Sequence, residues 1–147
     1  MIPLKLPVLS LLASLLVPGP VELEKAFLRT SSGLLRPVLA ETAVLISLPD
    51  PLSFSDQVTG EQATLLFSEI FTRYRTLEFY PESPLVTVPG KPGGIFKAHW
   101  SFRDVRTGAG HAFRLFFYLV RESGPAGPRL PGPVTVWKVS EIRAERR

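Results

Sequence analysis

The sequence predicts an α+β fold in which helices pack on one face of a curved antiparallel sheet. Two patterns carry this prediction. In the first half of the chain, apolar side chains recur every three or four residues, most clearly over 59–74, which is the period of an amphipathic helix. In the second half they alternate with polar ones, most clearly over 94–121, which is the period of a half-buried strand. Helices that precede a run of antiparallel strands are typical of α+β domains.

The segment 94–121 is predicted to be a β-hairpin with its loop at 107–110, where Gly108 and Gly110 provide the positive φ that a short loop needs. The first arm has one apolar and one polar face, so we expect one side of it to face the core. The second arm is apolar on both faces from Leu115 to Val120, which predicts a central strand covered on both sides. The apolar face of the first arm consists of Phe96, Ala98, Trp100 and Phe102, and its polar face of Lys97, His99, Ser101 and Arg103.

The helix over 59–74 has the clearest start signal in the chain. Thr59 and Gln62 have the spacing of a capping box, in which each side chain bonds the other residue's backbone amide. We expect Phe67 and Phe71 of this helix to pack on the hairpin face that carries Trp100. The full apolar stripe consists of Ala63, Leu66, Phe67, Ile70, Phe71 and Tyr74.

The remaining elements are predicted from shorter patterns. The last strand loses its alternation between Val139 and Ile142, which indicates a bulge or a strand end. Residues 85–88 are either a strand or part of a long loop. The other predicted elements are helices over 21–30 and 34–40, strands over 43–48, 76–80 and 134–144, and an exposed loop over 122–133.

Length and composition exclude several classes of function. A chain of 147 residues is enough for one domain with a core. The net charge of +4 comes from basic residues that are spread along the chain, so we expect no nucleic-acid partner. The absence of cysteine excludes disulfides and thiolate metal sites, and two histidines are too few for a multi-histidine site. We therefore expect neither a metal nor a cofactor.

The first 20 residues are predicted to be a signal peptide or an uncleaved N-terminal membrane anchor. Lys5 precedes an apolar run over 6–17, which is short for a membrane span and has the length of a signal-peptide core. Pro18-Gly19-Pro20 is interpreted as the end of this run, and no small-x-small cleavage site precedes it. We expect export to the periplasm or cell envelope, with residues 21–147 as a single domain. If residues 6–17 are not removed, they are its only membrane contact.

Three segments of the chain carry a family resemblance: Ser32-Gly33-Leu34 with Leu35 and Val38-Leu39; Leu45-Ile46-Ser47-Leu48 followed by Gly60-Glu61-Gln62-Ala63 and Leu66-Phe67; and Trp137-Lys138-Val139 with Glu141-Ile142-Arg143. They resemble a bacterial exported family of unknown function in the nuclear transport factor 2-like, or cystatin-like, superfamily. The resemblance covers about 21–143 and implies a cone-shaped fold. It also implies that an enzyme with this fold would use acid–base residues inside the cone, commonly an Asp–His or Tyr–Asp pair.

No residue of this chain stands out as catalytic. His99 lies on the polar face of its strand and His111 begins a strand beside the loop, so we expect both to be exposed. Asp104 stands between Arg103 and Arg106 and is interpreted as a surface ion-pair group.

A set of aromatic residues provides the ligand-binding candidates. They could line a pocket at the open end of the cone, or they could simply fill the core. The favoured function is a non-catalytic envelope domain that binds a small molecule or an envelope protein through its concave sheet face. Two alternatives remain open: a small acid–base enzyme such as an isomerase or dehydratase, and a structural module that dimerises through its outer sheet face. The candidates are Trp100, Phe102, Phe116, Tyr118 and Trp137.

Overall fold

The computed structural model describes residues 18–83, 85–87, 93–124 and 134–147. The predicted N-terminal signal or anchor therefore lies outside the described residues, apart from its last three. The helices are α2 (Pro18–Leu28), α3 (Ser32–Leu35), the 3-10 helix η1 (Arg36–Val38) and α4 (Gly60–Arg73). The strands are β1 (Val44–Leu48), β2 (Phe54–Val58), β3 (Tyr74–Pro81), β4 (Val86–Thr87), β5 (Gly93–Asp104), β6 (Gly110–Gly124) and β7 (Val134–Arg146).

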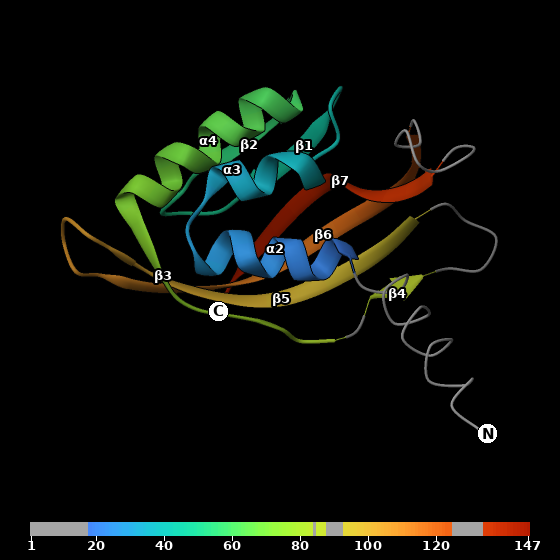
Figure 1. Ribbon diagram of the computed structural model, residues 1–147. Coiled ribbons are helices and arrows are strands. Elements are labelled where there is room, and N and C mark those ends of the chain that lie inside the picture. Colours follow the sequence, from blue (N-terminus) through green and yellow to red (C-terminus); the bar gives the residue numbers. More distant parts are fainter. Residues whose placement is uncertain (1–17, 84, 88–92, 125–133) are drawn as a thin grey trace, which may run out of the picture.

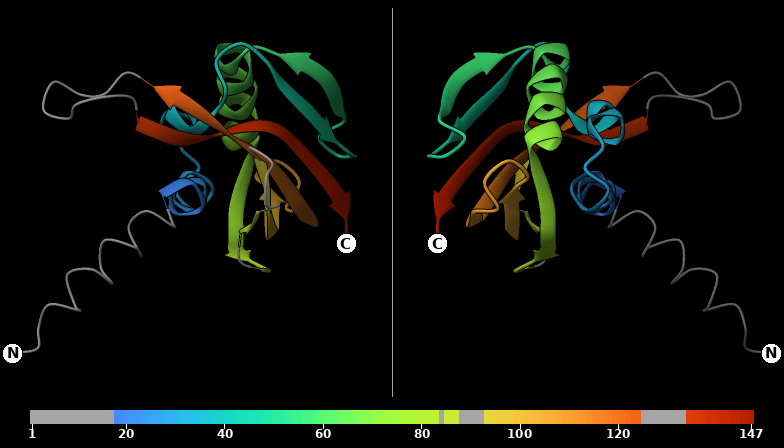
Figure 2. Two further views of the ribbon diagram at one scale, coloured as in Figure 1. Left: turned by 90° about the vertical axis from the view of Figure 1, so that its right-hand side faces the viewer. Right: turned by 90° about the vertical axis from the view of Figure 1, so that its left-hand side faces the viewer.

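The described strands form one sheet, and the helices lie on one face of it (Figure 1). The strand order is β2-β1-β7-β6-β5-β3, with the short β4 also paired to β5. Neighbouring strands run antiparallel except β1 and β7, which are parallel. The sheet curves around the helices (Figure 2). The predicted α+β fold with helices on one face of a curved sheet is confirmed.

The β5–β6 hairpin has the predicted faces. Phe96, Ala98, Trp100 and Phe102 are all buried and point toward the helices, and we call this side of the sheet the inner face. The opposite, outer face carries Lys97 and the other alternate residues of β5. The prediction that β6 is covered on both sides is wrong. Its alternate residues are buried on the inner face, whereas those on the outer face, such as Phe116, are only half-buried by their neighbours.

The core is centred on Phe27 of α2. Its ring stacks on Phe79 of β3 at 4.8 Å and meets the Trp100 ring edge-on at 5.1 Å. The aromatic neighbours of Phe67 and Phe71 on α4 are each other and Phe27. Phe27 of α2 therefore lies between α4 and the hairpin face and contacts both. The sequence patterns did not predict this position of α2.

α4 begins where its sequence predicts. Thr59 Oγ1 accepts a hydrogen bond from the backbone N–H of Gln62, and Gln62 Oε1 accepts one from the backbone N–H of Thr59. This reciprocal pair satisfies two of the backbone donors that every helix start leaves open. Along the helix Ala63, Phe67 and Ile70 are buried, as expected for the apolar stripe.

Other boundaries differ from the predictions for identifiable reasons. α2 starts at Pro18, because the first turn of a helix does not need the N–H that proline lacks. β2 was not predicted, since Ser55, Asp56 and Gln57 give it no alternation. It forms by pairing antiparallel with β1. β6 continues to Gly124, so the segment predicted as a loop begins later.

The predicted irregularity near the end of the chain is a β-bulge. In the β6–β7 register Tyr118 opposes Glu141 and Leu119 opposes Val139, which leaves Ser140 unpaired. The Ser140 hydroxyl donates to the carbonyl of Tyr118 at 3.1 Å. The extra residue restores the alternation, so that Val139 and Ile142 both point into the core.

Candidate functional site

The five predicted ligand-binding residues do not gather in one place. Trp100 and Phe102 have no exposed surface and pack against each other in the core. Phe116 and Tyr118 are half-buried on the outer face. Trp137 is half-buried near the start of β7, and the guanidinium of Arg121 lies 4.8 Å above its ring.

The predicted acid–base candidates form no hydrogen bond with one another. His99 is on the outer face, whereas the His111 ring lies 5.4 Å from that of Phe102 on the inner face. Asp104 is on the inner-face register of β5, like Phe102. The expectation that His99 and Asp104 are exposed is wrong, because 9% of His99 and 4% of Asp104 is accessible. His99 is thus on the opposite face from the other two, and the Asp104 carboxylate is bonded to Arg73 and to the hairpin loop rather than to a histidine.

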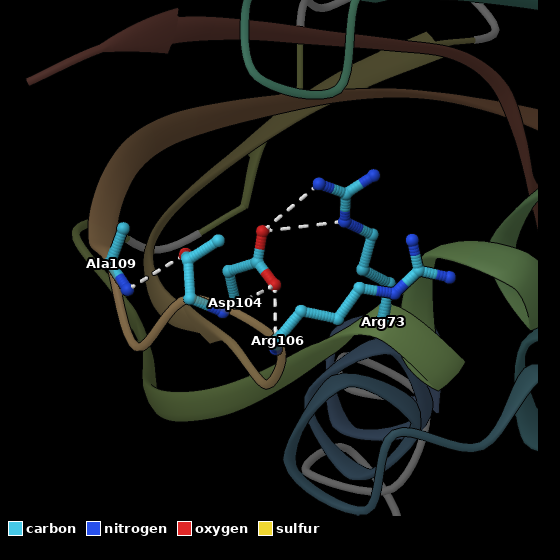
Figure 3. Close-up of polar contacts among 5 residues, drawn as sticks. Arg73, Asp104, Arg106 and Ala109 are labelled. Carbon is cyan, nitrogen blue, oxygen red and sulfur yellow. Dashed lines mark hydrogen bonds and ion pairs between the residues drawn. The ribbon is translucent and has the colours of Figure 1, made fainter.

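Asp104 holds the hairpin loop to the end of α4 (Figure 3). Its Oδ2 accepts hydrogen bonds from Nε and Nη2 of Arg73 at 3.3 and 3.1 Å. Its Oδ1 accepts from the backbone N–H groups of Arg106 at 2.8 Å and Thr107 at 3.4 Å. The charge partner is thus Arg73, distant in sequence, and not the adjacent Arg103 and Arg106 side chains. The Asp104 carboxylate is therefore hydrogen-bonded although it is buried, and it fastens the hairpin loop to the end of α4.

These contacts lower the pKa of Asp104 below its ordinary value of 3.8. The largest cause is the hydrogen bond from the Arg106 backbone N–H. The Arg73 guanidinium acts in the same direction, and burial opposes both. A folded-state pKa below the unfolded one means that the ionised carboxylate stabilises the fold above about pH 4. This stabilisation is lost as the pH falls through the folded-state pKa, below 3.8.

We therefore expect Asp104→Asn to melt at a lower temperature than wild type at pH 7, and the gap to shrink as the pH is lowered below about 4. The substitution replaces the charged carboxylate, which accepts hydrogen bonds from Arg73 and from the loop N–H groups, with a neutral amide. Thermal melts of both proteins at a series of pH values measure the gap. Asp56→Asn makes the same change on the exposed strand β2 and is the control. A gap that stays constant down to pH 3 would contradict the assignment.

The outer face carries a row of polar and aromatic side chains on three adjacent strands. Tyr80 of β3 opposes His99 of β5, and His99 opposes Arg114 of β6. The Tyr80 and His99 rings stack with centroids 4.7 Å apart. This stacking explains the burial of His99, whose Nδ1 has no hydrogen-bond partner among the described residues.

Glu82 joins this row to the end of β7. Its Oε2 accepts a hydrogen bond from Arg114 Nε at 3.0 Å, and its Oε1 forms an ion pair with Arg147 Nη2. One carboxylate therefore serves two guanidinium groups. We call Tyr80, Glu82, His99, Arg114 and Arg147 the outer-face polar cluster. Nothing in the sequence pattern links Glu82, in an irregular segment, to an arginine that lies 65 positions later, and only strand pairing brings them together.

The other half of the outer face carries two aromatic side chains, Phe116 and Tyr118, which oppose the charged Arg143 and Glu141 of β7. Ile95 opposes Tyr118 across the hairpin, and Lys97 opposes Phe116 with its ammonium 5.7 Å from the ring centre. A shallow hollow of about 220 Å³ lies beside Ile95 and Tyr118 and is also lined by Gly93, Gly94 and Ser140. Tyr118, one of the predicted candidates, therefore lines this depression, and Phe116 lies two residues away on the same face of β6.

The described part of the chain shows neither a metal site nor a membrane-spanning helix. No group of three or more histidine, aspartate or glutamate side chains there could hold a metal ion. Among the same residues, no helix combines the length and the apolar composition needed to cross a bilayer.

No protein-family model matches the sequence, and no curated protein matches it either. Solved structures do match the fold. A DUF4783 family protein from Bacteroides ovatus superposes with a TM-score of 0.61 at 17% identity, covering 90% of this chain and 96% of that one. A ketosteroid isomerase-like protein from Erwinia carotovora atroseptica gives 0.63 at 11% identity, covering 87% and 90%.

A third match is an NTF2-like protein of unknown function in nutrient uptake from Rhodospirillum rubrum. It gives a TM-score of 0.58 at 15% identity and covers 87% of this chain and 94% of that one. Identities this low establish the architecture and leave the activity open. The chain therefore has the nuclear transport factor 2-like fold, and the solved structures that share it include DUF4783 family proteins of unknown function.

Proposed function

We propose that this protein is an exported, non-catalytic binding domain of the cell envelope that binds a protein partner through the outer face of its sheet. Support for export comes from Lys5 and the apolar run over 6–17. Support for a non-catalytic role comes from two observations: His99 lies on the opposite face from His111 and Asp104, and the Asp104 carboxylate is engaged by Arg73 and the hairpin loop.

The choice of the outer face rests on one observation: the inner face is filled. Phe27 lies between the helices and the sheet, with its ring in contact with Phe79, Trp100 and Phe117. Each of these side chains is at most 4% exposed. A ligand could reach the inner face only by displacing this core, so the concave-face binding expected from the sequence is disfavoured.

The chemistry of the outer face favours a protein as the partner. Aromatic and arginine side chains are enriched at protein interfaces, and the energy of an interface is concentrated in a few of them. Here Phe116 and Tyr118 stand on neighbouring rows of β6, with Arg114 two residues from Phe116. Lys97 covers part of the Phe116 ring without burying it.

Site-specific photo-cross-linking in cells of the native organism tests this function. A photoreactive phenylalanine derivative at position 116 is expected to form one reproducible protein adduct, recovered in the envelope fraction. The matched control places the same derivative at Leu65, which is 63% exposed on α4, on the other side of the domain. An adduct with twice the mass of the chain would identify a second copy as the partner.

Two results would reject the proposal. Equal adduct formation at positions 116 and 65 would show that the outer face is not selective. Recovery of the protein in the cytoplasmic fraction would reject export, whatever the adduct.

A further inference from the structure

The β5–β6 hairpin ends in a loop that carries positive charge and no free negative charge. Between Glu82 and Glu122 the sequence contains one acidic residue, Asp104, which is buried and bonded to Arg73. The loop projects past the start of β3 and the end of β7 (Figure 1). We call the loop 105–110 and the two exposed arginines at its base the hairpin tip. Its charged and larger apolar side chains are Arg75, Arg103, Val105 and Arg106, all of them exposed.

Two of these arginines face each other without a counter-charge. Arg75 is the direct register partner of Arg103 on the outer face. Like charges at directly opposed positions of an antiparallel pair are destabilising. All 13 acidic residues of the chain lie within the described ranges, and none of them forms an ion pair with either arginine. Glu78, the next acid along β3, accepts a hydrogen bond from Ser101 instead. The pair therefore opposes folding of the free domain, which indicates a counter-charge outside the chain.

The loop holds a third arginine beside an apolar side chain. Val105 is 55% exposed, and Arg106 follows it. The backbone of both is fixed, because the Val105 N–H donates to the Arg73 carbonyl at 2.9 Å and the Arg106 N–H donates to Asp104 at 2.8 Å. Residues 107–110 are exposed and carry neither a charge nor an aromatic ring. The tip therefore presents cationic groups and one aliphatic side chain on a firm, narrow projection.

This combination matches an anionic membrane surface better than other anionic partners. Such a surface attracts each nearby arginine and also gains from burial of an exposed aliphatic side chain. Because it is flat, a projecting loop reaches it without a complementary cavity. Nucleic-acid sites combine charge with aromatic side chains on which bases stack, and the hairpin tip carries none. The centre of a protein interface is apolar with few charges, whereas Val105 is the only apolar side chain larger than alanine at the tip.

We propose that the hairpin tip binds the surface of membranes that contain anionic phospholipids. This contact is separate from the one expected of residues 6–17, because α2 starts at the opposite end of the domain from the loop (Figure 1). It does not depend on the protein partner proposed above, since neither Phe116 nor Tyr118 belongs to the tip.

A fluorophore placed on the tip tests the contact in the full chain. The chain has no cysteine, so a single introduced cysteine takes up an environment-sensitive nitrobenzoxadiazole label. Ala109→Cys places the label in the loop. Val86→Cys is the control, because Val86 is 55% exposed on β4, at the other end of β5. The measured quantity is the fluorescence with phosphatidylglycerol-containing vesicles minus that with phosphatidylcholine vesicles. A contribution of the N-terminal segment that does not depend on lipid charge cancels in this difference.

We expect the difference to be about twofold or more larger for the label at 109 than for the label at 86. It should shrink as salt is raised, because salt screens exposed charges. In the chain labelled at 109, Arg103→Gln or Arg75→Gln is expected to raise the half-saturating concentration of anionic lipid about fivefold. Arg36→Gln is the control, since Arg36 is an exposed arginine of η1 without an ion pair among the described residues.

Thermal melts without lipid separate a binding role from a structural one. Arg103→Gln and Arg75→Gln are expected to melt at the same temperature as wild type or higher, because each removes the opposed like charges. A lower melting temperature would show that the two arginines serve the fold, and would remove the argument for an external anion.

Three binding results would also overturn the proposal. They are an equal vesicle difference at positions 109 and 86, an Arg103→Gln chain that binds as well as Arg36→Gln, and a stronger response at 109 to a DNA duplex or an oligoglutamate peptide than to the vesicles at equal concentration of anionic groups. The last would identify another class of anion as the partner. None of these measurements involves a protein partner, so their failure is distinguishable from failure of the cross-linking experiment.

Discussion

Phe27→Ala is expected to destabilise the domain by about 3–5 kcal/mol, the usual cost of truncating a buried phenylalanine. The Phe27 ring has no exposed surface and has five aromatic neighbours, on α4 and on three different strands. Truncating the Phe27 ring leaves a cavity. The neighbouring rings cannot move in to fill it, because they are fixed on α4 and on three different strands. A domain of this size is stable by only about 5–15 kcal/mol, so the variant should be close to unfolding.

Chemical denaturation of wild type, Phe27→Ala and Leu28→Ala measures this effect. Leu28 is the next residue of α2 and is 49% exposed, so its truncation is expected to change the free energy of unfolding by less than about 1 kcal/mol. Similar unfolding midpoints for Phe27→Ala and Leu28→Ala would mean that α2 does not pack on the sheet as described.

Gly60→Ala is expected to destabilise the domain by about 1–3 kcal/mol, although alanine is the better helix former. A Cβ atom at position 60 would lie 2.5 Å from the carbonyl oxygen of Ala40 and 3.3 Å from Cα of Glu41. Both are backbone atoms, so no side-chain rotation relieves the contact. The Gly60 N–H also donates to the Glu41 carbonyl at 3.0 Å, so a shift of α4 would strain this hydrogen bond as well.

Gly33→Ala is the matched control in α3. The nearest atom to its added Cβ is Ser31 Oγ at 3.8 Å, an ordinary van der Waals distance. We expect Gly33→Ala to be neutral or stabilising, by up to about 1 kcal/mol. Thermal melts of the two variants measure this difference in stability. A Gly60→Ala protein at least as stable as Gly33→Ala would show that α4 does not begin against the Ala40 backbone.

Elements with a strong local signal were predicted correctly from the sequence. The capping box of Thr59 and Gln62 is made by residues three apart, so the helix start needs no distant contact. The inner face of β5 follows from alternation alone, because successive side chains of a strand point to opposite sides. β2 has neither signal, and it is a strand only because β1 provides an edge to pair with.

The role of the aromatic candidates as a binding site stays a prediction, and the structure shows only where each of them lies. Alternation placed Phe116 and Tyr118 on one face of β6, but it could not distinguish them from Trp100 and Phe102, which lie on the other face of the sheet. Burial of the latter pair is decided by α2, whose Phe27 occupies the space where a pocket was expected. Aromatic composition identifies candidates, and only packing separates core from surface.

By itself, the sequence determined where most of the helices and strands lie and which of their faces are apolar, since both are set by neighbours a few positions apart; β2 is the exception, because its pairing with β1 makes it a strand. The tertiary structure alone decided the partners: Arg73 for Asp104, Tyr80 for His99, and Glu82 for both Arg114 and Arg147. Each of these contacts depends on strand register or on a helix end that meets a hairpin loop. Register is fixed by the whole sheet, because a shift of one residue would exchange its inner and outer faces.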